Sequence, residues 1–105
     1  MKRYNIKITS DAKRDMDRIL AYLSDVLHNG QAVRNVWQDY LDTREALSRT
    51  AGLKPDPDSP ALRARGLKRI EFRRHDYFLL FKIVGDDVFI TNVFHTLEDF
   101  ERKLR

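Results

Sequence analysis

The chain has 105 residues, a length typical of one domain. Hydrophobic residues make up 42% of it and charged residues 34%, the net charge is +4, and there are no cysteines, which excludes disulfide bonds and thiolate metal sites. No apolar run near the start is long enough for a signal peptide, and no stretch approaches the roughly 18 apolar residues of a membrane span. We therefore expect a single domain over residues 1–105, and the lack of cysteines is compatible with a reducing cytoplasm.

The first half of the chain predicts a strand and two helices. Tyr4–Thr9 alternates apolar and polar residues, which is typical of a strand with one buried face. Apolar residues then recur at helical spacing over Ala12–Leu27 and Val33–Ala51, and Ser10 can cap the first of these helices. Asn29-Gly30 ends the first helix, so we expect the two helices to pack as an antiparallel hairpin.

The second half predicts a loop, three strands and a short helix. The loop, Leu53–Gly66, holds all three prolines. The predicted strands and the final helix are Leu67–Arg73, Tyr77–Val84, Val88–His95 and Glu98–Arg105. The order β-α-α-β-β-β-α predicts an α+β fold, with a helical hairpin on one face of a mostly antiparallel sheet. The other face is expected to stay partly open.

Positive charge gathers before and within the first strand of this second half. Six cations and one acid, Glu71, give the segment Arg63–Arg74 a net charge of +5, which exceeds the +4 of the whole chain. Such a patch attracts phosphate or an acidic protein, although a solvated charged surface is the alternative.

The strand period of two assigns these residues to faces. It places Ile70 and Phe72 in the core, and Arg69, Glu71 and Arg73 on the open face. Phe78 and Leu80 are also expected on the open face, where exposed apolar groups suit a partner's side chains. If Phe94 is buried in the core, His95 faces the open side too, unless a bulge reverses the alternation.

The segment from Leu67 to Phe100, LKRIEFRRHDYFLLFKIVGDDVFITNVFHTLEDF, resembles the RelE/ParE superfamily of bacterial toxins from type II toxin–antitoxin modules. The pieces that match are the aromatic strand Tyr77–Ile83, the turn Gly85–Asp87, and His95 with Asp99. The resemblance implies a RelE/ParE-like domain whose principal partner is a protein antitoxin.

The resemblance leaves two targets open. RelE-like members are similar to small ribonucleases that cut mRNA on the ribosome, whereas ParE-like members resemble inhibitors of DNA gyrase. RelE-like chains carry an arginine early in the aromatic strand, where this chain has Phe78. That departure favours the gyrase inhibitor, with the mRNA endonuclease as the alternative. A further alternative is a non-toxic protein-binding domain of the same fold.

RNA cleavage would require a proton donor and cations that stabilise the phosphorane. Histidine, with a pKa of about 6.5, suits proton transfer, and arginine binds phosphate through two nitrogens. If the protein is a nuclease, we expect Arg73 and His95 to be catalytic, with Arg65 and Arg69 positioning the RNA. The full set expected to bind nucleic acid or a partner is Arg63, Arg65, Lys68, Arg69, Arg73, Arg74, Phe78, Leu80 and Lys82.

Structural roles compete with these assignments. His95 could instead bond the final helix beside Glu98, and Glu71 is favoured as an ion-pair partner of the arginines over a general base. His75 is expected to be exposed in the turn before the aromatic strand. The sequence contains no metal-ligand constellation and no glycine-rich phosphate loop, so we expect neither a metal nor a cofactor.

Overall fold

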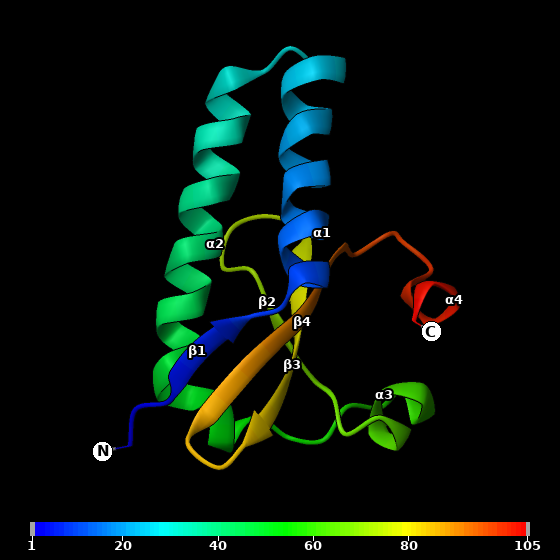
Figure 1. Cartoon of the computed structure of the whole chain (residues 1–105). Helices are drawn as coiled ribbons and strands as arrows, with labels where there is room; N and C mark the ends of the chain where they lie inside the picture. Colours follow the sequence, from blue (N-terminus) through cyan, green and yellow to red (C-terminus); the bar gives the residue numbers. More distant parts are fainter. Residues whose placement is uncertain (1, 105) are drawn as a thin grey trace.

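The computed structural model describes residues 2–104 and contains every predicted strand and helix (Figure 1). The first half forms β1 (Asn5–Ile8), α1 (Ser10–Ala21), the π-helical turn η1 (Tyr22–Val26), α2 (Gly30–Thr50) and the 3-10 turn η2 (Ala51–Leu53). The second half forms α3 (Pro60–Ala64), β2 (Lys68–Glu71), β3 (Tyr77–Val84), β4 (Asp87–His95) and α4 (Phe100–Lys103). The short α3, inside the proline-containing loop, was not predicted.

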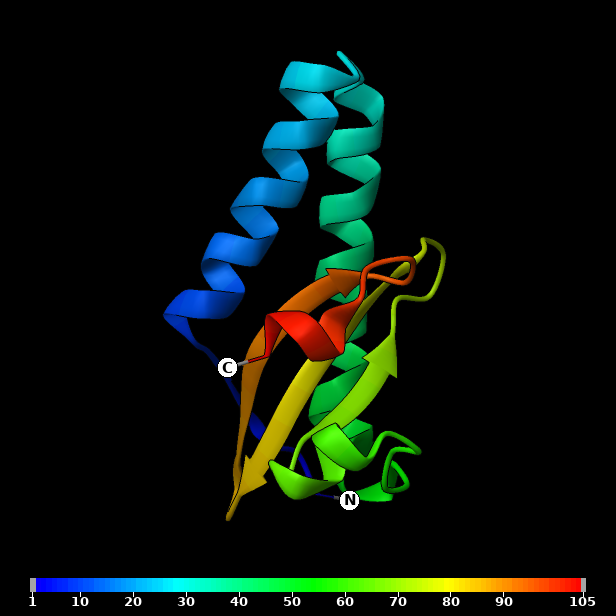
Figure 2. The same cartoon turned by 90° about the vertical axis from the view of Figure 1, so that its right-hand side faces the viewer.

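Side-chain caps fix where the two long helices begin. The Thr9 hydroxyl accepts the Ala12 N–H at 3.2 Å, so Thr9, and not the predicted Ser10, is the N-cap of α1. Asn29 caps α2 by accepting the Ala32 N–H at 3.0 Å. The chain turns back between them, and α1 and α2 lie side by side, which confirms the predicted hairpin (Figures 1 and 2).

The four strands form one sheet in the order β1-β4-β3-β2. β1 runs parallel to β4 and the other neighbours are antiparallel, so the sheet is mostly antiparallel as predicted. The helical hairpin covers one face, and its apolar side chains pack on buried strand residues that include Ile70, Phe81 and Ile90. None of the helices in residues 2–104 is both long and apolar enough to cross a membrane.

The opposite face of the sheet is not open. α3 and α4 lie over it (Figure 2), and Leu62 of α3 and Phe100 of α4 pack on a second apolar cluster built around Phe78, Leu80 and Phe94. Phe78 and Leu80 have no exposed surface, so their predicted exposure is wrong. The reason is that two short segments, far apart in sequence, supply the apolar cover.

A bulge in β4 changes which way its last residues point. Leu80 pairs with Asn92 and Phe81 with Ile90, so the register skips Thr91. Phe94 is therefore buried in the second cluster, and His95, opposite Tyr77, lies on the face that the hairpin covers. The expectation that His95 shares a face with Arg69 is wrong for this reason.

Candidate binding groove

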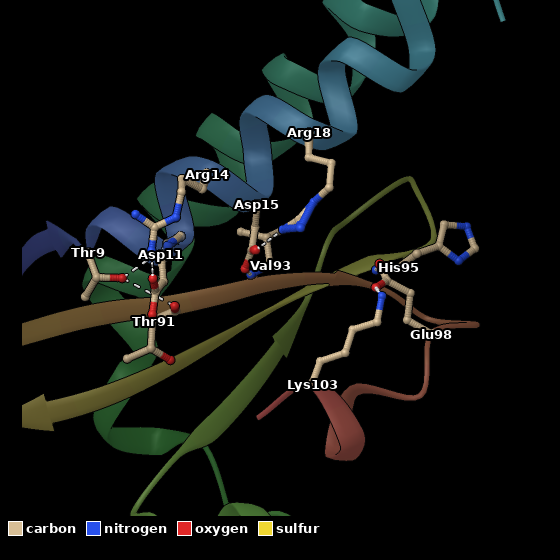
Figure 3. A network of polar contacts seen from close by, with 11 residues as sticks. Thr9, Asp11, Arg14, Asp15, Arg18, Thr91, Val93, His95, Glu98 and Lys103 are labelled. Atoms are coloured by element: carbon tan, nitrogen blue, oxygen red, sulfur yellow. Dashed lines mark hydrogen bonds and ion pairs between the residues drawn. The ribbon is translucent and has the colours of Figure 1, made fainter. Parts of the chain in front are cut away.

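A groove runs along β4 between α1 and α4. It consists of three adjoining hollows of about 610, 500 and 280 Å³, all of which are lined by Lys103. One end of the groove holds Arg65 and Lys82, and the other end holds His95. We call it the β4 groove, and Figure 3 shows some of the residues along it, among them Asp15, Arg18 and Lys103.

The β4 groove carries an excess of positive charge. Three carboxylates line it, Asp11, Asp15 and Glu98, against six cations, Arg14, Arg18, Arg65, Lys82, Arg102 and Lys103. The difference of three charges is most of the net charge of +4 that the protein carries. This surface would attract an acidic ligand, and the attraction would weaken as salt is added.

Asp15 ties α1 to β4 in the middle of the groove. One carboxylate oxygen accepts the backbone N–H of Val93 at 2.9 Å, and the other lies 2.5 Å from the Arg18 guanidinium. Arg14 forms an ion pair with Asp11 one turn earlier (Figure 3). Both arginines are thereby held beside β4 by neighbouring carboxylates.

Glu98 ties two segments together at the His95 end of the groove, as Asp15 does in the middle. Its oxygens accept the backbone N–H of His95 at 3.0 Å and a hydrogen bond from the Lys103 ammonium at 2.7 Å. Burial opposes the ionisation of Glu98, but Lys103 and the His95 N–H outweigh it and lower the pKa of this carboxyl. Glu98 therefore holds α4 against the end of β4 (Figure 3).

The His95 imidazole is fixed by its neighbours. Its Nδ1 accepts the Leu97 N–H at 3.1 Å, so the neutral ring carries its proton on Nε2. The ring also meets Tyr77 edge to face, with centroids 5.1 Å apart. The predicted bond between His95 and the segment around Glu98 is present, and no hydrogen bond within residues 2–104 engages Nε2.

Arg69 lies on the second face of the sheet as predicted, but its guanidinium already has partners. Nη2 is 2.7 Å from Glu71, and the guanidinium carbon stands 3.7 Å from the centroid of the Phe78 ring. The ion-pair interpretation of Glu71 is confirmed. A guanidinium that is stacked on a ring and paired with a carboxylate has fewer free donors and less net charge with which to bind a phosphate.

Other members of the predicted basic set hold the loop before β2. Arg63 donates to the carbonyls of Pro57 and Asp58 at 2.8 and 2.7 Å, and Lys68 donates to the carbonyl of Lys54 at 2.8 Å. Arg65 and Lys82 line the β4 groove. The basic segment is thus divided between internal bonds and the groove.

The loop after β2 is held by a buried carboxylate that the sequence did not reveal. Asp39 of α2 has no exposed surface, and it accepts the N–H groups of Arg73 and Arg74 at 3.1 and 2.9 Å. It also lies 2.7 Å from Nδ1 of His75, which is half-buried, whereas exposure was predicted. These bonds end β2 at Glu71, although the sequence predicted a strand as far as Arg73.

Asp39 stays ionised in spite of its position. Burial favours the neutral acid, but the bonds from His75 and the two N–H groups outweigh that effect and lower the pKa of Asp39. Arg74 forms an ion pair with Asp42, and no hydrogen bond or ion pair within residues 2–104 engages the Arg73 guanidinium.

Arg73 and His95 do not share a hollow. The Thr96 N–H donates to the Asp76 carbonyl at 2.9 Å, so the loop after β2 and the end of β4 adjoin. However, the hollow that contains His95 is lined by Arg18 and Lys103, and not by Arg73. The joint catalytic role of Arg73 and His95 stays a prediction of the nuclease hypothesis.

The contribution of α1 to the groove was not predicted. Asp11 and Asp15 are four residues apart, as are Arg14 and Arg18, so each pair lies on one side of the helix. That spacing was the available signal. Among residues 2–104, no cluster of acidic or histidine side chains could hold a metal ion.

Comparisons with known proteins support the fold. No protein-family model matches the sequence, and no curated protein does. A chain of the chromosomal ParDE TA system from P. aeruginosa superimposes with a TM-score of 0.71 at 19% identity, over 89% of this chain and 96% of that one. A chain of the RelBE2 toxin–antitoxin complex from Mycobacterium tuberculosis does so with a TM-score of 0.56 at 21% identity, over 89% and 98%. The protein therefore has the α+β fold of the RelE/ParE-like toxins, as the resemblance predicted.

Proposed function

We propose that the protein is the toxin of a type II toxin–antitoxin module, acts in the cytoplasm, and is neutralised by a protein antitoxin that binds the β4 groove. The observation that carries this proposal is the similarity of nearly the whole chain to chains from two toxin–antitoxin assemblies. The net positive charge of the groove supports an acidic antitoxin segment as its ligand.

We favour inhibition of DNA gyrase as the toxic activity. RNA cleavage needs a cation and a proton donor at one phosphate, yet Arg69 is engaged by Glu71 and Phe78, and Arg73 lies outside the hollow of His95.

One observation favours the second candidate, a ribosome-dependent mRNA endonuclease. His95 keeps its Nε2–H available, and Arg18 and Lys103 line the same hollow. In that mechanism His95 would protonate the leaving 5′-oxygen, and Arg18 or Lys103 would have to exchange its carboxylate partner for the phosphate. A non-toxic binding domain of the same fold would show neither activity.

Two assays on the purified protein separate these functions. The gyrase inhibitor should block supercoiling of relaxed plasmid by DNA gyrase and leave mRNA intact in a translation extract. The endonuclease should cut mRNA only when ribosomes are present. Failure of both, together with normal growth of bacteria that express the chain, would refute the toxin proposal.

A charge-reversal pair tests the role of the groove. Arg65→Glu with Lys82→Glu should weaken binding of the antitoxin encoded beside this chain, and more so at low salt than at high salt. Lys13→Glu with Arg34→Glu is the matched control, since both residues are exposed and lie outside the groove. Equal affinity of the two double variants at every salt concentration would exclude the groove.

A further inference from the structure

The hollow at the His95 end of the β4 groove has aromatic walls. Tyr77 and His95 meet edge to face there, and Tyr22 of η1 lines the same space. With a volume of about 280 Å³, the hollow has room for one aromatic side chain. We call it the aromatic pocket.

Tyr22 is only partly used by the fold. It is 53% exposed, which leaves much of its ring without a partner. It begins the π-helical turn, in which the Leu27 N–H donates to the Tyr22 carbonyl at 3.2 Å. Single π-helical turns occur frequently at functional sites. An aromatic guest between Tyr22 and Tyr77 would bury both rings.

The charges around the pocket decide between a polypeptide and a nucleic acid. Arg18 is paired with Asp15 at 2.5 Å, and Lys103 with Glu98 at 2.7 Å. A phosphate backbone laid here would meet two carboxylates and two cations that are already neutralised. A polypeptide does not carry a charge at every unit and can place an uncharged side chain at this point.

Uncompensated positive charge lies at the other end of the groove. Arg65 donates to a backbone carbonyl, and Lys82 is exposed; within residues 2–104 neither forms an ion pair. Tyr77 and Lys82 are five residues apart on β3, which corresponds to about 17 Å along the strand, and their side chains point to opposite faces of the sheet. A partner in extended conformation that passes from one to the other along the groove would therefore need at least about five residues.

We propose that the aromatic pocket binds a Phe, Tyr or Trp side chain of a polypeptide partner, and that acidic residues at least about five positions away contact Arg65 and Lys82. That the polypeptide is an antitoxin rests on the proposed function. The preference of the pocket for an aromatic anchor follows from its own walls and charges.

The test is selection of peptides on the purified protein from a random dodecapeptide library displayed on phage, followed by measurement of Kd for the best peptide. The selected peptides should share an aromatic residue with acidic residues at the stated spacing. Replacing that aromatic residue by alanine should weaken binding about tenfold or more. Peptides without a shared aromatic residue would overturn the proposal.

A pair of variants locates the binding site. Tyr22→Ala should weaken the binding of the same peptide by a similar factor, whereas Val26→Ala should leave its Kd unchanged. Val26 is 58% exposed in the same turn and outside the groove, so it controls for loss of any apolar surface on η1. Both variants should unfold at the wild-type temperature. Equal binding by the two variants would overturn the proposal.

A single-stranded RNA of matched net charge serves as competitor. The RNA and the unlabelled peptide are each used to displace labelled peptide from the protein. If the RNA does so at the lower concentration, the choice of a polypeptide as ligand is overturned. If the protein inhibits growth but selects no aromatic peptides, the proposed pocket is refuted and the proposed function stands. If it selects aromatic peptides but does not inhibit growth, the proposed function is refuted and the pocket stands.

Discussion

Asp39 offers a sharp test of how the loop after β2 is held. Asp39→Ala removes a buried carboxylate that accepts two backbone N–H groups and bonds His75. The N–H groups of Arg73 and Arg74 then lose their partner, and the loop loses its attachment to α2. We expect lower stability and a loop that exchanges its amide hydrogens faster.

The cost follows from the bonds that are lost. Hydrogen bonds to a charged group contribute about 1.5–3 kcal/mol each, so two of them amount to about 3–6 kcal/mol. Arg73 and Arg74 are exposed, so water replaces part of what is lost. We therefore expect a decrease of about 3 kcal/mol in the free energy of unfolding.

Urea unfolding followed by circular dichroism measures this quantity, with the m-value compared between variants. Asp42→Ala is the matched control. Asp42 lies on the same helix as Asp39, but it pairs with the exposed side chain of Arg74. Surface pairs of that kind contribute about 0–1 kcal/mol. If Asp39→Ala costs no more than Asp42→Ala, the proposed role of the buried carboxylate is refuted.

Three further predictions follow. Phe100→Ala should cost about 2 kcal/mol, roughly half the value for a fully buried ring, because Phe100 packs edge-on to Phe78 at 5.4 Å; Leu97→Ala, 88% exposed in the same segment, should cost nothing measurable by urea unfolding. Because the pKa of Asp39 is lowered from 3.8 in the folded protein, the stabilisation it provides should be complete above that pH and lost as the pH falls further; in acid titrations, a constant difference between wild type and Asp39→Asn would contradict this. Growth inhibition should survive His95→Ala if gyrase is the target, whereas a nuclease should lose about 10²–10⁴-fold in single-turnover mRNA cleavage.

The local pattern of β2 and β3 predicted their faces well. Arg69 and Glu71 lie on one face and Ile70 and Phe72 on the other, because alternation along a regular strand depends on neighbouring residues alone. The same rule failed on β4, where the register skips Thr91. The bulge is supported by the hydroxyl of Thr9, which donates to the carbonyls of both Ile90 and Thr91, a contact across some eighty residues that alternation does not encode.

The covered second face and the Asp39 site escaped prediction for a related reason. Leu62 and Phe100 belong to very short helices, whose few apolar residues give no amphipathic pattern, yet together they bury Phe78. Asp39 sits in a long helix where a polar residue predicts an exposed position, and its partners lie more than thirty residues away. Only the folded chain brings these groups together.

Contacts between residues far apart in sequence also decide where the protein can bind an acidic ligand. The basic segment has the highest charge density in the sequence, but Arg69 and Arg74 are paired with acids, and Arg63 and Lys68 bond loop carbonyls. The β4 groove instead combines Arg65 and Lys82 with cations from α1 and α4 that are distant in sequence. Where a carboxylate neutralises one of those distant cations, the cation can orient a ligand but adds little net attraction. We therefore expect a ligand to be attracted at the Lys82 end and to be selected at the aromatic end, where the cations are already paired with carboxylates.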